Sequence, residues 1–142
     1  MMRKFLLACG ALVLLFAFGG CASEPKLKAQ THATFALDAE KKTTVVKTRF
    51  AEEIKLELPP IAEPGFHWQL FAHDARCLHQ TSEISAPAGP QRISTVTFIA
   101  IRIVPRTLVR FLLVNDDAGL EATPVDRQDV TVQISSGAPS AD

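Results

Sequence analysis

Apolar and polar residues alternate in short runs along most of the chain, and no helical periodicity is sustained over several turns. Alternation with a period of two predicts a β-strand with one buried face. The runs lie at 34–37, 44–48, 54–58, 66–70, 95–100, 109–113 and 130–134. Loops rich in Pro, Gly, Asn and Asp separate them, so we expect an all-β chain of about seven strands, arranged as an antiparallel β-sandwich.

One stretch, LPPIAEPGFHWQL at 58–70, joins a loop with three prolines and one glycine to a strand that holds the only tryptophan. The prolines restrict the loop backbone, and Gly65 can adopt a positive φ. Trp68 is then expected to point into the sandwich, as the buried Trp of immunoglobulin-like domains does. The predicted core residues are Phe66, Trp68, Phe98, Phe111 and Leu113.

The N-terminus has the pattern of a secretory signal. Arg3 and Lys4 precede an apolar run at 5–18, which is shorter than the roughly 20 residues of a membrane-spanning helix. The run ends in Phe18-Gly19-Gly20-Cys21, which resembles the lipobox of bacterial lipoproteins. We therefore expect Cys21 to be lipidated; the alternative is a cleaved secretory protein whose Cys21 is incidental.

These segments give a predicted domain organisation. Residues 1–20 form the signal peptide, 21–32 the lipidated cysteine and a polar tether, 33–135 the β-sandwich and 136–142 a flexible tail. Ala22 follows Cys21, and no aspartate stands there as an inner-membrane retention signal. The expected location is the cell envelope, on the outer membrane and facing the periplasm.

Charge and cysteine content limit the possible functions. Basic and acidic residues number 15 each, and removal of the signal leaves a nearly neutral chain without the concentrated basic face of a nucleic-acid-binding protein. Cys9 would leave with the signal and Cys21 would carry lipid, so Cys77 has no disulfide partner. Cys77 is expected to be a small buried apolar residue in a strand; the alternative is a reactive thiol.

Motifs of enzymes and metal sites are missing from the sequence. It has no Gly-x-Ser-x-Gly, phosphate loop or dinucleotide fingerprint, so we expect no enzyme activity and no cofactor. His67, His73 and His79 have no metal-ligand spacing and are expected to be solvated. The acidic segment after 114 lacks the ligand pattern of a calcium loop, and we expect no metal there.

Several motifs resemble those of chagasin-type inhibitors of papain-like cysteine peptidases. Leu58-Pro59 and Gly65-Phe66-His67-Trp68 match the family's Leu-Pro and Gly-aromatic-x-Trp frame, Phe98-Ile99-Ala100 matches its Phe-x-Ala, and the final VTVQI is similar to its last strand. The resemblance covers nearly the whole domain. It implies an immunoglobulin-like sandwich and a papain-like peptidase as partner.

In that family, three loops at one end of the sandwich fill the peptidase cleft. The family's Asn-Pro-Thr-Thr is replaced here by PIAEP, its Gly-rich loop corresponds to APAGPQ, and its Arg-Pro-Trp is absent. Glu63 would also bring a carboxylate near the catalytic thiolate. The residues that the resemblance assigns to the partner-binding loops are Ala62, Glu63, Pro64, Gly65, Gly89, Asn115, Asp116 and Asp117.

Two functions are consistent with this sequence. The first is a lipid-anchored inhibitor of a papain-like cysteine peptidase. The second is a non-inhibitory immunoglobulin-like binding or structural lipoprotein, in which Glu63, Asp116 and Asp117 form an acidic tip that binds a basic partner or another envelope protein.

Overall fold

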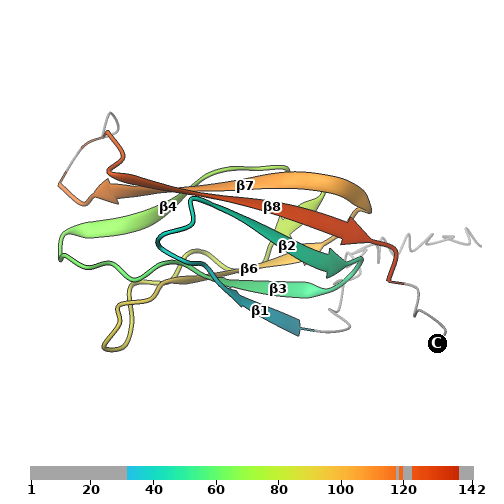
Figure 1. The fold of residues 1–142 in the computed structure, drawn as a ribbon, viewed down its shortest axis with the longest axis horizontal. Coiled ribbons are helices and arrows are strands. Elements are labelled where there is room, and N and C mark those ends of the chain that lie inside the picture. The colour runs from blue at the N-terminus through green and yellow to red at the C-terminus, as the bar shows by residue number, and fades with distance from the viewer. Residues whose placement is uncertain (1–31, 118, 120–122, 138–142) are drawn as a thin grey trace, which may run out of the picture.

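The computed structural model describes residues 32–117, 119 and 123–137 (Figure 1). The predicted signal peptide, Cys21 and the tether at 22–31 lie outside these residues, as does the end of the predicted tail, 138–142. The description therefore concerns the predicted sandwich domain.

The described residues form eight β-strands and no helix. All seven predicted strands are confirmed, and β5 is an additional short strand. The strands are β1 (His32–Ala36), β2 (Thr43–Arg49), β3 (Glu53–Glu57), β4 (Phe66–His73), β5 (Leu78–Gln80), β6 (Thr95–Ala100), β7 (Val104–Asn115) and β8 (Asp126–Ser135).

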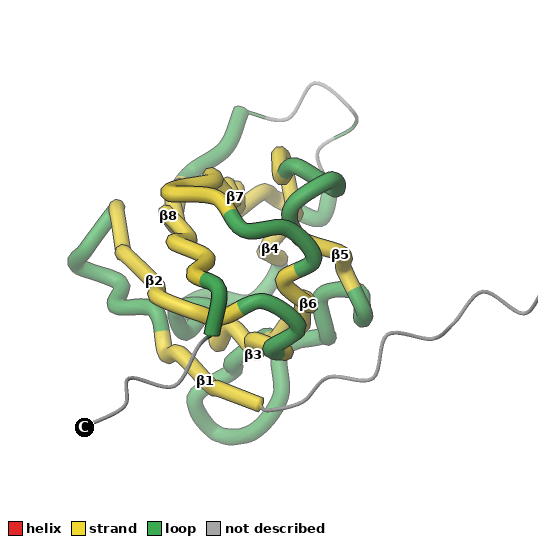
Figure 2. The backbone as a smooth tube through the Cα atoms, turned by 90° about the vertical axis from the view of Figure 1, so that its right-hand side faces the viewer, coloured by secondary structure: helices red, strands yellow, loops and turns green. Residues whose placement is uncertain are grey.

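The strands form two four-stranded sheets, with strand orders β1-β3-β6-β5 and β2-β8-β7-β4. Figure 2 shows the two sheets packed as layers. The predicted all-β sandwich is confirmed, but the sheets are mixed, because β1 runs parallel to β3 and β2 runs parallel to β8. Alternation predicts which face of a strand is buried, but it does not encode the direction of the neighbouring strand.

The core lies between the two sheets. Phe98 and Phe111 are fully buried and Trp68 is 3% exposed, while Phe66 and Leu113 are partly buried and pack against the same cluster. Both sheets contribute, since Trp68 and Phe111 lie on β4 and β7 of one sheet and Phe98 lies on β6 of the other. The five aromatic and aliphatic residues chosen from the sequence therefore belong to one core.

Strand β7 is longer than the sequence pattern indicated. Pro105 lies within β7, where the pairing with β8 shifts register between Val104 and Thr107. Such an irregularity can accommodate a residue without a backbone N–H. The prolonged strand carries the sheet from one end of the domain to the other.

An ion pair links β7 to β8 on the outer face of their sheet. Arg110 Nε lies 2.7 Å from Asp129 Oδ1, and Nη2 lies 2.9 Å from Oδ2. Hydrogen bonding by Arg110 lowers the pKa of the Asp129 carboxyl, which therefore stays ionised at neutral pH. The bidentate geometry helps to fix the register of these two long strands.

Trp68 offers a test of the fold. Its side chain is buried and its indole N–H donates a hydrogen bond of 3.0 Å to the carbonyl oxygen of Pro59. Trp68→Ala should lower the free energy of unfolding by about 3–5 kcal/mol, as other large-to-small core substitutions do. Trp68→Phe should cost less, because it keeps an aromatic ring and loses mainly the hydrogen bond.

Urea denaturation followed by far-ultraviolet circular dichroism measures both variants, since neither retains a tryptophan. The wild-type emission maximum should be blue-shifted. A solvent-like emission maximum in the folded domain, or equal stability of Trp68→Ala and wild type, would contradict the burial.

Candidate functional site at the loop end

Three loops from different parts of the chain lie at one end of the sandwich. We name them loop 1 (residues 58–65), loop 2 (85–94) and loop 3 (116–125, of which 118 and 120–122 are not described). Strand register explains their position, because Glu57 pairs with Thr95 and Phe66 pairs with Asn115. Figure 1 shows the three loops at the left-hand end, which we call the loop end.

Loop 1 is held against the core and against loop 2. Leu58, Pro59 and Ile61 are buried, and the Pro59 carbonyl oxygen accepts the bond from Trp68. The backbone N–H of Leu58 donates to the Ser94 carbonyl at 2.9 Å, and that of Ile61 donates to the Arg92 carbonyl at 3.4 Å. The first half of loop 1 is therefore fixed before any partner binds.

Loop 1 is also joined to loop 3. The backbone N–H of Asp116 donates to the Gly65 carbonyl at 2.9 Å, and the side chains of His67 and Asp116 are hydrogen-bonded. In the turn that follows β7, the backbone N–H of Asp117 donates to Asn115 Oδ1 at 2.9 Å. The sequence predicted a solvated His67; the side chain is half exposed, yet its Nδ1 is engaged with loop 3.

Loop 2 folds back on itself. Ala88 and Ile93 form an isolated antiparallel bridge, and the N–H of Arg92 donates to the Gly89 carbonyl at 3.2 Å. Gly89 has a φ of +73°, and Arg92, which is not a glycine, also has a positive φ of 52°. Arg92 was not among the candidate residues from the sequence, since neither its φ nor its position beside loop 1 can be read from the residue pattern.

The candidate loop residues are brought together and most are accessible. Ala62, Glu63, Pro64 and Gly65 are exposed, as are Gly89, Asp116 and Asp117, while Asn115 is half-buried. A Cβ added at Gly65 or Gly89 would meet no atom within 4 Å. The backbone at both glycines is therefore open to close approach by another molecule.

The loop end carries acidic groups from two loops. Glu63 is exposed in loop 1, and Asp116 and Asp117 are exposed in loop 3. The His67 side chain bonds to Asp116, and the Arg92 carbonyl accepts a bond from loop 1, so His67 and Arg92 share this end with the carboxylates. The arrangement presents a partner with both acidic side chains and open backbone.

The His67 side chain bonds to loop 3, whereas the side chains of His73, His79 and Cys77 lie outside the three loops. Among the described residues, no group of three or more His, Cys, Asp or Glu side chains could hold a metal ion. The His73 ring packs against Phe98 with 5.6 Å between ring centroids. Cys77 is buried in the turn just before β5 rather than in a strand, and burial raises the pKa of its thiol, which makes it a poor nucleophile.

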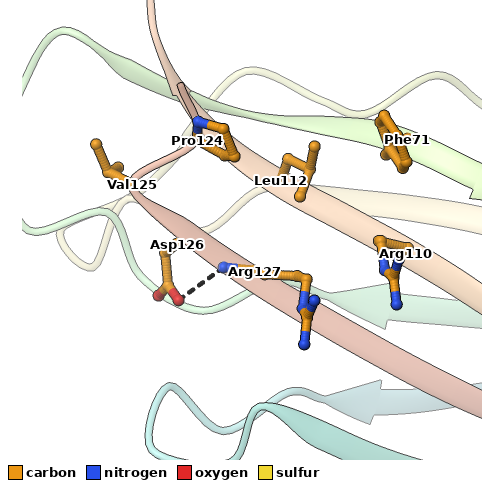
Figure 3. A pocket seen from close by; sticks show the side chains of 7 residues that line it. All are labelled: Phe71, Arg110, Leu112, Pro124, Val125, Asp126 and Arg127. Carbon is orange, nitrogen blue, oxygen red and sulfur yellow. Dashed lines mark hydrogen bonds between the residues drawn. The ribbon is translucent and has the colours of Figure 1, made fainter. Parts of the chain in front are cut away.

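A shallow hollow of about 400 Å³ lies on the outer face of the β2-β8-β7-β4 sheet, and no sequence pattern predicted it. Apolar side chains of Phe71, Leu112 and Val125 surround it, with Arg110 and Arg127 alongside (Figure 3). Its rim includes Pro124 and Val125, so the hollow borders loop 3. No helix among the described residues is long and apolar enough to cross a membrane.

Comparison with known proteins supports the fold. No protein-family model matches the sequence, and no curated protein matches it. The structure is similar to that of EhICP2, a cysteine protease inhibitor from Entamoeba histolytica, with a TM-score of 0.57 and 14% sequence identity over 74% of this chain and 97% of that one. The resemblance to chagasin-type inhibitors is thus supported at the level of the fold.

Two further solved structures are more distant. PbICP-C, determined in complex with falcipain-2, has a TM-score of 0.45 and 10% identity, and covers 71% of this chain and 98% of its own. Amebosin has a TM-score of 0.42 and 13% identity, with coverage of 73% and 96%.

Gly65 provides a test of the loop geometry. Its φ is +88°, a left-handed conformation in which an L-residue is strained, while Gly119 in loop 3 has no such φ, and a Cβ at either position would meet open space. Gly65→Ala should therefore lower the free energy of unfolding by about 1–2 kcal/mol through the backbone alone. Gly119→Ala is the matched control and should change stability little. Equal unfolding midpoints in urea for the two variants would contradict the conformation of loop 1.

Proposed function

We propose that the chain is a lipid-anchored cell-envelope protein whose loop end binds the active-site cleft of a papain-like cysteine peptidase and inhibits it. The proposal rests on one observation: backbone hydrogen bonds join loop 1 to loops 2 and 3 at one end of the sandwich. The fold that the chain shares with a cysteine protease inhibitor supports the same partner class.

Preorganisation favours a role in binding. A protein that inserts loops into a cleft loses less conformational entropy when those loops are already fixed. Loop 1 is bonded to loop 2 at Ile61 and to loop 3 at Gly65, so its exposed segment between these points is held at both ends. That segment comprises Ala62, Glu63 and Pro64, which are exposed.

The side chains make this a weak inhibitor. The Arg-Pro-Trp motif is missing from the sequence, and the loss of one aromatic hot spot typically costs about 2 kcal/mol or more, roughly thirtyfold in affinity. Glu63 would also lie near the catalytic thiolate, where two negative charges repel each other. Binding would therefore depend mainly on backbone contacts at the open glycines.

Titration of the protein lacking its signal and lipid, residues 22–142, against papain tests this function. We expect weak competitive inhibition, and Glu63→Thr should strengthen it about tenfold or more by removing the carboxylate from the cleft. Glu53→Thr is the control, because Glu53 is a glutamate at the opposite end, bonded to His32, and it should leave inhibition unchanged. Activity that is unchanged at saturating protein would reject inhibition.

An acidic tip without inhibitory activity is the second candidate, favoured by the exposure of Glu63, Asp116 and Asp117 at one end. It predicts the opposite response to Glu63→Thr, namely weaker binding. Capture of partners from solubilised envelope by wild type and by a Glu63→Thr, Asp117→Asn variant distinguishes the two. Salt should weaken this binding, since it screens exposed charges.

The anchor belongs to the proposal because Phe18-Gly19-Gly20-Cys21 follows an apolar signal. Acyl chains on Cys21 would hold the domain on a bilayer, each buried methylene being worth about 0.8 kcal/mol. Ala22 at the next position favours the outer membrane, facing the periplasm.

Cys21→Ser tests the anchor. The variant should accumulate as an unprocessed precursor that incorporates no labelled fatty acid, while wild type is labelled. Cys77→Ser is the matched control, since that thiol is buried in the domain, and it should be labelled as wild type is. Equal labelling of wild type and Cys21→Ser would exclude lipidation at Cys21.

A further inference from the structure

We propose that the end of the sandwich opposite the loops is a second interaction surface, which lies against the anionic phospholipid headgroups of a bilayer. We call it the membrane-facing end and define it by Phe50, Ile103, Arg49, Arg102 and Arg106. The inference rests on the anchoring part of the proposed function and is independent of peptidase inhibition.

Two chain turns form the apolar part of this end. The turn between β2 and β3 contains Phe50, and the turn between β6 and β7 contains Ile103. Both lie beside the end of β8, because Arg49 pairs with Ser135 and Val104 pairs with Ile134. Figure 2 views the domain from this end, with the turns toward the viewer.

Phe50 and Ile103 are held with their side chains in solvent. Phe50 is 42% exposed and Ile103 is 54% exposed. The Phe50 backbone N–H donates to the Ser135 carbonyl at 2.9 Å, and the next residue, Ala51, is buried with a φ of +64°. Because this hydrogen bond and the buried Ala51 hold the backbone of the turn in place, the fold itself keeps the Phe50 ring partly exposed.

Cationic side chains surround these apolar residues. Arg49, Arg102 and Arg106 are exposed, as is Lys47 on the adjoining strand. No salt bridge within the described part of the chain involves Arg102 or Arg106. A further arginine, Arg76, lies in the β4–β5 turn at this end, where its hydrogen bonds to Asp74 lower the pKa of that carboxyl to about 2, so that both side chains are charged at neutral pH.

Acidic side chains at this end form hydrogen bonds within the domain. Glu53 bonds to His32 at 3.0 Å, and Glu52 accepts hydrogen bonds from Thr48 Oγ1 at 2.6 Å and from the Arg49 backbone at 3.0 Å. Apolar side chains ringed by arginines are the combination that binds the interface of an anionic membrane, because the ring enters the headgroup layer while the guanidinium groups meet phosphate.

The position of the proposed anchor indicates that a bilayer is the partner of the membrane-facing end. Strand β1 begins at His32, which pairs with Glu53, so the chain enters the domain at the membrane-facing end. Residues 22–31 between Cys21 and β1 can span at most about 36 Å when fully extended. A lipid on Cys21 would therefore keep this end close to the membrane, while Glu63, Asp116 and Asp117 lie at the far end.

Vesicle binding tests the surface without the lipid anchor. Residues 22–142 contain all eight strands and should sediment with vesicles of phosphatidylethanolamine and phosphatidylglycerol mixed at about three to one, and not with phosphatidylcholine vesicles. Arg102→Gln and Arg106→Gln should each lower the partition coefficient about fivefold, and added salt should weaken binding.

Apolar variants test the second element of the surface. Phe50→Ser and Ile103→Ser should each lower partitioning about tenfold. Val125→Ser, which removes a residue that is 60% exposed at the loop end, and Lys41→Gln in the β1–β2 loop are matched controls and should have no effect. Unfolding midpoints in urea should be unchanged for all of these variants, since the altered side chains are exposed.

The outcomes distinguish failure of the membrane-facing end from failure of the proposed inhibition and of the proposed anchor. No partitioning into anionic vesicles, or an equal loss from Val125→Ser and Ile103→Ser, would overturn the membrane-facing end. Vesicle binding by a protein that fails to inhibit papain would leave the surface standing and reject inhibition. Binding by residues 22–142 together with no labelling at Cys21 would leave the surface standing and reject the anchor.

Discussion

The hydrogen bond from Trp68 to the Pro59 carbonyl connects the core of the domain to the loop end. Its donor belongs to a buried side chain of β4 and its acceptor to loop 1, at a separation of 3.0 Å. Pro59 is itself buried, so breaking the bond would leave the indole N–H and the Pro59 carbonyl oxygen buried without partners, which costs free energy. This bond and the buried side chains of Leu58 and Ile61 hold loop 1 on the core, and loop 1 in turn bonds to loops 2 and 3.

Features that depend on neighbouring residues could be predicted from the sequence, whereas features that depend on distant residues could not. Alternation located the seven main strands and the core positions, because burial on one face leaves a period-two pattern. The parallel pairing of β1 with β3 and the bond between His67 and Asp116 depend on residues far apart in sequence, which no local pattern encodes. Arg92 was missed for the same reason: its positive φ comes from the closure of loop 2, and arginine is not a residue that suggests such a turn.

The bonds that join the loops use backbone atoms almost throughout. The Ile61 N–H, the Gly65 carbonyl and the Leu58 N–H would be available with many other side chains in these positions. A loop end of this kind can therefore keep its shape with side chains that differ from the family's motifs. This is why the fold resembles a cysteine protease inhibitor while the side chains at 60–64 and 115–117 differ from the family pattern.

Long strands that run from one end of the domain to the other divide its chain turns into two groups. Loops 1, 2 and 3 lie at one end with Glu63, Asp116 and Asp117, and the turns with Phe50 and Ile103 lie at the other beside Arg49, Arg102 and Arg106. The start of β1 belongs to the second group. Under the proposed lipid anchor, a tether attached there would direct the loop end away from the bilayer. Anionic headgroups would attract the arginines at the opposite end and repel the acidic loop end, which favours the same orientation. The charge distribution and the chain topology thus act in the same direction.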